Sequence, residues 1–239
     1  MNASTTAATA PTRGYNNRAF WERLWKLSGV NFVVFFIVAY AVYGHQPQLG
    51  APADALTGFY TGDRSRILIA AVISGLALLN LLWFVAALRT ILADAGLDGW
   101  GAAATAASTT VGAMFLLFIA VGGGLAYSIA GSGNQALTSG LNDFAWATVV
   151  ASSFPRAMLI MAGTFGFWRA GYISNAYFGV GVAGLVLVLL GGTTWLPGGF
   201  WSPDGTYSRF VSPIICLAWV VAASGIVFRR SPPATRAGW

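Results

Sequence analysis

Charged residues are scarce in this sequence. Only 8% of its 239 residues are Asp, Glu, Lys or Arg, whereas 56% are apolar. A soluble globular domain averages about 25% charged residues, so this chain lacks the polar surface that a protein facing water on all sides needs. The mean hydropathy of +0.67 agrees with this. The low charge content therefore excludes an ordinary soluble domain and indicates an integral membrane protein.

Cysteine and histidine are each present only once. The single cysteine, Cys216, excludes an internal disulfide and a cluster of thiolate metal ligands. The single histidine, His45, follows the first apolar block, so no histidine lies inside an apolar block to bind haem or a metal. We therefore expect no metal site and no cofactor.

The apolar blocks also lack the groups that familiar intramembrane enzymes use. No block contains an Asp or a Glu, and the only lysine, Lys26, precedes the first block. An intramembrane serine protease needs a histidine, an aspartyl protease needs two carboxylates, and a lipid phosphatase needs paired arginines and histidines. A retinal protein needs a lysine in its last span. The sequence therefore predicts a protein that is not an enzyme.

Long apolar blocks are what the sequence does contain. About 20 helical residues cross the hydrocarbon core of a bilayer, and a block of about 18 or more apolar residues indicates a membrane span. The fifth block is rich in glycine and could end near Leu190. The pattern predicts an all-α, polytopic transmembrane helix bundle with six spans, at about 27–43, 67–88, 109–130, 144–168, 177–195 and 210–228.

The positions of the basic residues predict the orientation. Nine Lys and Arg fall in segments on the same side as the N-terminus, whereas Arg64, Arg66 and Arg209 fall on the other side. Cytoplasmic loops carry the excess of Lys and Arg, so we expect both termini in the cytoplasm and the protein in the cell membrane. Residues 1–26 are expected to form a disordered tail and an interfacial segment, and 229–239 a second tail.

The net charge of +6 does not indicate nucleic acid binding. The basic residues flank the apolar blocks and do not form one patch, so the predicted surroundings are the lipid bilayer and no nucleic acid is expected.

Arg156 is the sharpest single feature, because it lies in the middle of the fourth block. A charged residue there is costly and usually faces a bundle interior or a wet cavity. Pro155 removes a backbone donor and predicts a kink, and Ser152 lies one turn before Arg156. Counting helical rise from the outer ends of their spans places Asn80 at a similar depth. These four residues form the predicted polar site.

Two interpretations of Arg156 remain open from the sequence. Because no carboxylate lies within a span, the site could receive an anion, such as a carboxylate or a lipid headgroup. Alternatively, Arg156 could bind the carbonyls freed by Pro155 and hold helices together.

A second cluster precedes the second block and comprises Phe59, Tyr60, Asp63, Arg64 and Arg66. Asp63 is expected to cap the following helix, where a negative charge is favourable, and the two aromatic residues are expected at headgroup level. A role as an outer gate or a lipid phosphate contact is the alternative.

Part of this region resembles a known group. Phe59-Tyr60, the stretch Asp63 to Leu68, Leu82-Trp83-Phe84 and Leu88-Arg89 resemble a loosely defined group of uncharacterised bacterial multi-span integral membrane proteins. The resemblance implies a membrane protein and, since that group has no established activity, implies no function.

Three functional classes follow from these patterns. The first is a small transporter or channel-like protein with a polar site in mid-membrane, which would take an anionic small molecule or a lipid headgroup. The second is an accessory or scaffold subunit with a membrane-protein or homo-oligomeric partner. The third is a lipid-interacting protein. We favour the first, because an ionisable residue inside the membrane indicates a functional site.

Overall fold

The computed structural model describes residues 16–230, with side chains from Trp25 onward except that of Lys26. The predictions for residues 1–15 and 231–239 lie outside this part of the chain. Within it the protein is all-α and has no strand. The helices are α1 (Asn16–Tyr43), α2 (Ala53–Gly62), α3 (Arg64–Asp94), α4 (Asp98–Gly124), α5 (Gln135–Ala151), α6 (Ser153–Arg169), α7 (Asn175–Leu190) and α8 (Ser212–Arg230).

Five helical segments are long and apolar enough to cross a membrane, which confirms the multi-pass prediction. They are Arg64–Asp94, Asp98–Ser132, Gln135–Arg169, Asn175–Thr193 and Tyr207–Arg230. The glycine-rich fifth block is among them. The apolar part of α1, Leu27–Tyr43, is shorter than these five segments.

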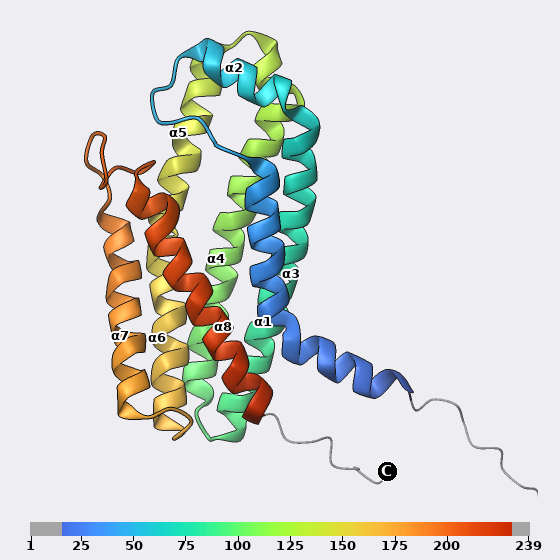
Figure 1. Ribbon diagram of the computed structural model, residues 1–239, viewed down its shortest axis with the longest axis vertical. Helices are drawn as coiled ribbons and strands as arrows, with labels where there is room; N and C mark the ends of the chain where they lie inside the picture. The colour runs from blue at the N-terminus through green and yellow to red at the C-terminus, as the bar shows by residue number, and fades with distance from the viewer. Residues whose placement is uncertain (1–15, 231–239) are drawn as a thin grey trace, which may run out of the picture.

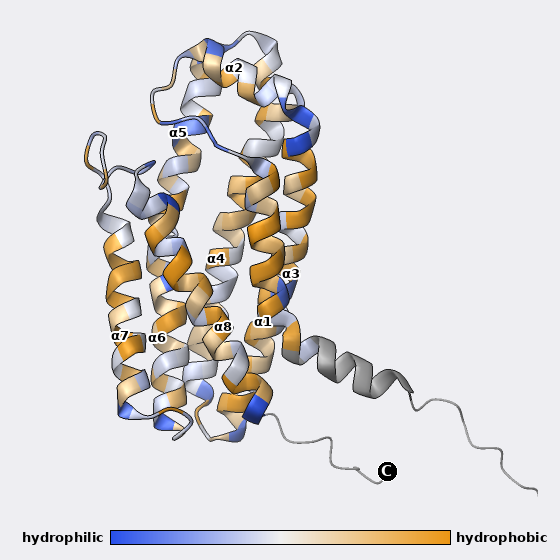
Figure 2. Cartoon of the chain, in the orientation of Figure 1, coloured by the Kyte–Doolittle hydropathy of each residue, from blue (hydrophilic) through white to orange (hydrophobic). Residues whose placement is uncertain are grey.

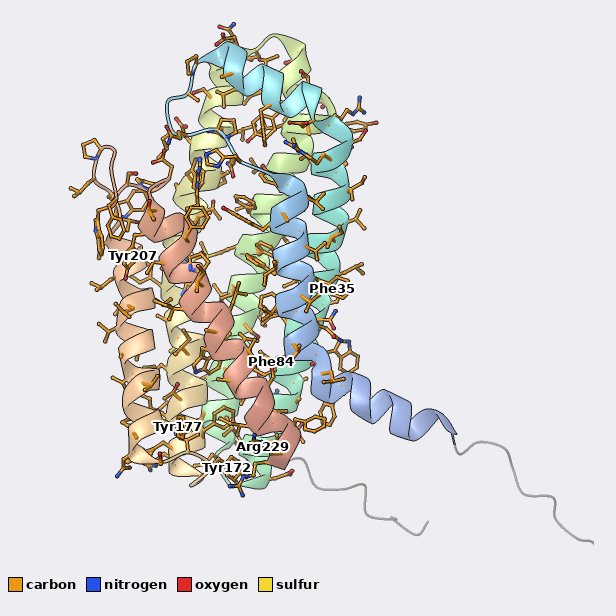
Figure 3. All side chains as sticks on the ribbon, in the orientation of Figure 1. Phe35, Phe84, Tyr172, Tyr177, Tyr207 and Arg229 are labelled. Atoms are coloured by element: carbon orange, nitrogen blue, oxygen red, sulfur yellow. The ribbon has the colours of Figure 1, made fainter. Side chains whose placement is uncertain are left out.

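The long helices form a ring in which each packs against the next one along the chain. The order is α1, α3, α4, α6, α7 and α8, and α8 closes the ring on α1. Figure 1 shows α8, in red, crossing obliquely from the C-terminal end of α7 toward α1. Successive helices of the ring run in opposite directions. In Figure 3, Tyr207 lies at the end where α8 begins, and Tyr172 and Arg229 lie at the opposite end.

One end of the bundle carries a polar cap. Helix α2 lies across this end, over α5 and the π-helical turn Leu125–Ile129 that follows α4. Leu56 and Tyr60 of α2 are fully buried there against Leu125 and Ile67. Figure 2 shows that this end is more hydrophilic than the body below it. We call it the outer end, following the predicted orientation.

The largest apolar core fills the opposite half of the bundle. Phe84, Leu88 and Leu92 of α3 are buried there together with residues of α1, α4, α6 and α8. A Cβ built on Gly163 would lie only 2.6 Å from Cη2 of Trp219, and one on Gly29 only 2.7 Å from Cδ2 of Phe84. Glycine at these two positions therefore permits close helix contacts.

Candidate functional site

A cavity of about 390 Å³ lies inside the outer half of the bundle, with residues of α1, α3, α4, α5, α6 and α8 as its walls. Most of the lining is aliphatic or aromatic. No Asp or Glu belongs to it, whereas two arginines, Arg156 and Arg209, do. The walls are therefore mainly apolar, and the charged side chains among the described residues that line them are all positive.

The backbone break beside Arg156 explains its position. Helix α5 ends at Ala151 and α6 begins at Ser153, so the fourth predicted span is interrupted at Ser152. Pro155 has no N–H to donate to the carbonyl of Ala151, four residues earlier. At the place of the predicted kink the helical segment Gln135–Arg169 is interrupted at the single residue Ser152, which lines the cavity.

The Arg156 side chain is 9% exposed and turns back along its own segment. Its Nε donates to the Ser152 carbonyl at 3.2 Å, and its Nη2 donates to the Val149 carbonyl at 3.2 Å and to Ser153 Oγ at 2.9 Å. The acceptors lie near the end of α5, at Ser152 and at the start of α6, so these bonds bridge the junction of α5 and α6.

Two donors of Arg156 remain. A guanidinium carries five N–H groups, and the three bonds above use one on Nε and two on Nη2. The Nη1 nitrogen donates to no group in residues 16–230, and it is not among the enclosed atoms that lack a partner. Because Arg156 lines the cavity, we infer that Nη1 faces this space.

Another polar group lies close to Arg156 and has no partner. The Ser212 hydroxyl is buried and makes no hydrogen bond in the described chain. A Cβ built on Gly191 would lie 2.9 Å from Ser212 Oγ and 2.7 Å from Ser153 Oγ, the acceptor of Arg156. Both hydroxyls therefore flank the same point at the outer end of α7.

Asn80 is at the predicted level but on a different face of its helix. Cδ2 of Leu88 would lie 3.6 Å from a Cβ at Gly163, so Arg156, seven residues before Gly163, is level with Leu81, seven residues before Leu88.

Leu81 and Ser74 line the cavity, whereas Asn80 does not. Six helical residues turn the chain by roughly 120° relative to the starting direction, which carries Asn80 away from Ser74 and from the cavity. Its Nδ2 donates to the carbonyl of Leu76 at 2.9 Å, within the same helix. The structure therefore does not bring Asn80 to Arg156.

Arg209 stands where the cavity meets the outer end. Its guanidinium lies 4.8 Å from the ring centre of Trp146, and its Nη2 donates to the Gln46 carbonyl at 3.1 Å. Its Nη1 lies 2.7 Å from Nε2 of His45. A second, polar cavity of about 390 Å³, lined by His45, Asp204 and Arg209 among others, lies on the other side of the same arginine.

The cluster before α3 differs from its prediction at two residues. Asp63 precedes α3, but its side chain makes no capping hydrogen bond and pairs with Arg66 at 2.5 Å. Tyr60, expected at headgroup level, is 0% exposed, and its hydroxyl donates to Asn142 Oδ1 at 3.0 Å. The hydrogen bond to this acceptor replaces the bond to water that the Tyr60 hydroxyl loses on burial.

The other cluster members make aromatic contacts at the outer end. The Arg66 guanidinium lies 5.9 Å from the ring centre of Phe59, and that of Arg64 lies 4.8 Å from the ring centre of Tyr127. None of the five residues lines the cavity that contains Arg156, so this cluster and Arg156 are separate features.

Sequence reasoning missed the residues that close the outer end of the cavity. Asn142 and Trp146 lie at a predicted span boundary, and Gln46 lies in a predicted loop. Asn142 accepts from Gln46 Nε2 at 3.3 Å and donates to the Gln48 carbonyl at 3.3 Å, while Trp146 Nε1 donates to the Pro47 carbonyl at 2.9 Å. The one available signal was the pair of polar residues Asn142 and Asp143 beside an aromatic run.

In the described chain no three His, Cys, Asp or Glu side chains gather where they could hold a metal ion. No protein family, no curated protein and no solved structure matches the sequence.

Proposed function

We propose that this protein is a six-span membrane carrier for a small organic anion, with Arg156 as the group that binds the anion. The proposal rests on one observation: a buried arginine whose Nη1 makes no hydrogen bond in the described chain lines a cavity that no carboxylate lines. The absence of an acidic lining residue leaves this charge to be balanced by a ligand.

The energetics of a buried charge favour an anion at this place. Removing a guanidinium from water is costly unless a counter-ion or hydrogen-bond acceptors compensate for the lost water. Neutral acceptors satisfy three donors of Arg156, but its charge has no partner of opposite sign along the cavity. Charge-assisted hydrogen bonds are roughly twice as strong as neutral ones, so a carboxylate, sulfonate or phosphate oxygen on Nη1 would be bound preferentially.

The packing indicates what closes the inner side of the carrier. Toward the inner end the bundle is filled by Phe84, Leu88 and Trp219, with the two aromatic ring centres 6.5 Å apart. Trp219 Nε1 also donates to Thr164 Oγ1 at 3.0 Å. We propose that this apolar layer is the inner gate, and that alternating access requires it to open.

The six-span topology adds α1 to the five longer segments. The apolar part of α1 runs beside α3 and packs against α8, and spans as short as about 17 residues are known. With six crossings both termini lie on one side. The Lys and Arg distribution then supports a cytoplasmic position for both termini, with the polar cap outside.

Uptake by proteoliposomes tests the carrier. Radiolabelled benzenesulfonate is a suitable probe because a sulfonate stays ionised and does not cross lipid as a neutral acid. We expect saturable uptake above empty vesicles, and a reduction of at least tenfold in Arg156→Gln. Arg169→Gln changes an exposed arginine at the far end of the same helix and should leave uptake unchanged. Equal uptake by wild type and Arg156→Gln would contradict the proposal, and a co-purifying membrane partner with no uptake would favour the accessory-subunit alternative.

A further inference from the structure

We infer that the anion bound at Arg156 is an amphiphile, a single anionic head on an alkyl chain, and that it enters from the lipid between α1 and α8. This inference rests on the proposed function and adds to it the class of substrate and its route.

The lining of the cavity indicates an apolar body for the ligand. The wall beside and below Arg156 is built from residues such as Phe36, Phe115, Leu159 and Leu217. A polar or multiply charged ligand would lose its hydration there without new hydrogen bonds. An alkyl chain has no hydration of this kind to lose, so the walls select a hydrophobic body, and the buried Arg156 selects a negatively charged head.

The volume sets the size of that body. A group of the size of a water molecule, which is close to that of a methylene, takes roughly 30 Å³. The 390 Å³ cavity therefore accommodates about a dozen such groups. This is enough for a charged head with a chain of medium length.

The crossing of α1 and α8 provides the route. The two helices meet closely at Gly29, where a Cβ would clash with Ser224, and they diverge toward the outer end (Figure 1). Figure 3 shows Phe84 beneath the lower part of α8, below this divergence. The two helix axes therefore lie farther apart above the packed core than at Gly29.

Several side chains between α1 and α8 line the cavity and are also exposed on the surface of the bundle. Ile37 and Tyr40 of α1 line the cavity and are 55% and 43% exposed, and Phe210 and Ile214 beside them are 40% and 59% exposed. The Tyr40 and Phe210 rings stand edge to face with centres 6.2 Å apart. At this seam, between α1 and α8, the same side chains line the cavity and are exposed at the surface of the bundle.

A chain-length series tests the substrate class. Binding of ethane-, butane-, hexane-, octane- and decanesulfonate to the full protein in nanodiscs is measured against the free aqueous concentration, below micelle formation. We expect affinity to rise about three- to fourfold per methylene and then to level off when the chain fills the cavity. Partition into the nanodisc lipid alone gives no such plateau, so a continuous rise that is equal in empty nanodiscs would overturn the inference.

The same series separates this inference from the proposed function. If ethanesulfonate binds as tightly as octanesulfonate and both depend on Arg156, the amphiphile is wrong and the anion carrier stands. If no member of the series loses affinity in Arg156→Gln, the proposed function itself fails.

The route has its own test. Ile214→Trp enlarges a side chain in the seam, and we expect it to slow association of octanesulfonate at least tenfold. Val221→Trp is the matched control, because Val221 is 44% exposed on the same helix but lies outside the cavity wall. Ethanesulfonate, which can enter past Arg209 from the aqueous side, should associate at the wild-type rate in both variants. Unchanged octanesulfonate rates in Ile214→Trp, with Ile37→Trp giving the same result, would overturn the lateral route.

Discussion

The hydroxyl of Tyr60 donates a hydrogen bond to Oδ1 of Asn142, at 3.0 Å, across 82 residues of sequence. Both side chains are 0% exposed. Because Asn142 also accepts from Gln46 and donates to the Gln48 carbonyl, this one amide joins α2, α5 and the segment after α1. Of these parts, α5 contributes Trp146 and the segment after α1 contributes Gln46 to the outer wall of the cavity.

Replacing this amide should destabilise the protein. Asn142→Leu leaves the Tyr60 hydroxyl and the Gln46 amide buried without an acceptor, and each such group costs about 1–3 kcal/mol. In a chain of this size each kcal/mol lowers Tm by about 2–4 °C, so we expect a fall of several degrees by thermal unfolding in detergent. Thr61→Ala, which removes an exposed bond within α2, should shift Tm by no more than about 2 °C. Equal Tm values for Asn142→Leu and wild type would refute the role of this amide.

The same contact predicts a pH dependence. Burial raises the pKa of the Tyr60 hydroxyl well above its usual value of 10.0, with the nearby Tyr43 acting in the same direction. Above about pH 10 the unfolded chain releases this proton and the folded chain keeps it, so stability falls as pH rises. Between pH 9 and pH 11 the wild type should lose roughly 1 kcal/mol more than Tyr60→Phe. Parallel stability profiles for the two proteins would contradict this.

Gly163 should not tolerate a side chain. A Cβ there would lie 2.6 Å from Trp219 Cη2 and 3.6 Å from Leu88, in the layer that we propose as the inner gate. Gly163→Val should cost about 1–3 kcal/mol through overpacking, visible as a lower Tm and less folded protein after size exclusion. Gly75→Val is the control, because no atom lies within 4 Å of its Cβ position. If both variants behave alike, the close contact at Gly163 is not a determinant of packing.

The six-span topology can be checked by labelling single cysteines. In a Cys216→Ser background, Leu196→Cys lies between α7 and α8 and Ala95→Cys lies between α3 and α4, and both sites are exposed. A membrane-impermeant maleimide should label Leu196→Cys in intact cells and Ala95→Cys only after permeabilisation. The reverse pattern would invert the orientation, and labelling of both in intact cells would remove the assigned crossings between them.

Much of the membrane architecture could be predicted from the sequence. The block at 67–88 lies within α3 and the block at 210–228 within the helical segment Tyr207–Arg230, because apolar runs of this length have no other stable environment. Residues 98–108 were missed as helix, since their Gly and Ala residues resemble a loop and yet begin α4. Helix α2 was also missed. It is only ten residues long and is stabilised by contacts with α5 and the turn after α4.

The candidate site was predictable in part. The break at Ser152 and the cavity position of Arg156 follow from a proline and a charge in an apolar block. Depth could be counted along each span, and it placed Asn80 at the level of Arg156. The direction in which the Asn80 side chain points could not be predicted from the sequence, because the rotation of α3 about its axis is set by its contacts with α1 and α4. The Arg209–Trp146 contact joins residues 63 positions apart, and local sequence gives no information about such a pair.

Equilibrium binding of octanesulfonate to wild type and to Arg156→Gln in nanodiscs tests the central claim most directly. Arg169→Gln serves as the charge-matched control, and Arg156→Lys retains the positive charge without the forked donors. A hydrogen bond to a charged group contributes about 1.5–3 kcal/mol, so Arg156→Gln should bind at least tenfold more weakly, with Arg156→Lys between it and the wild type. Equal affinity for wild type and a folded Arg156→Gln would show that Arg156 is not the anion site.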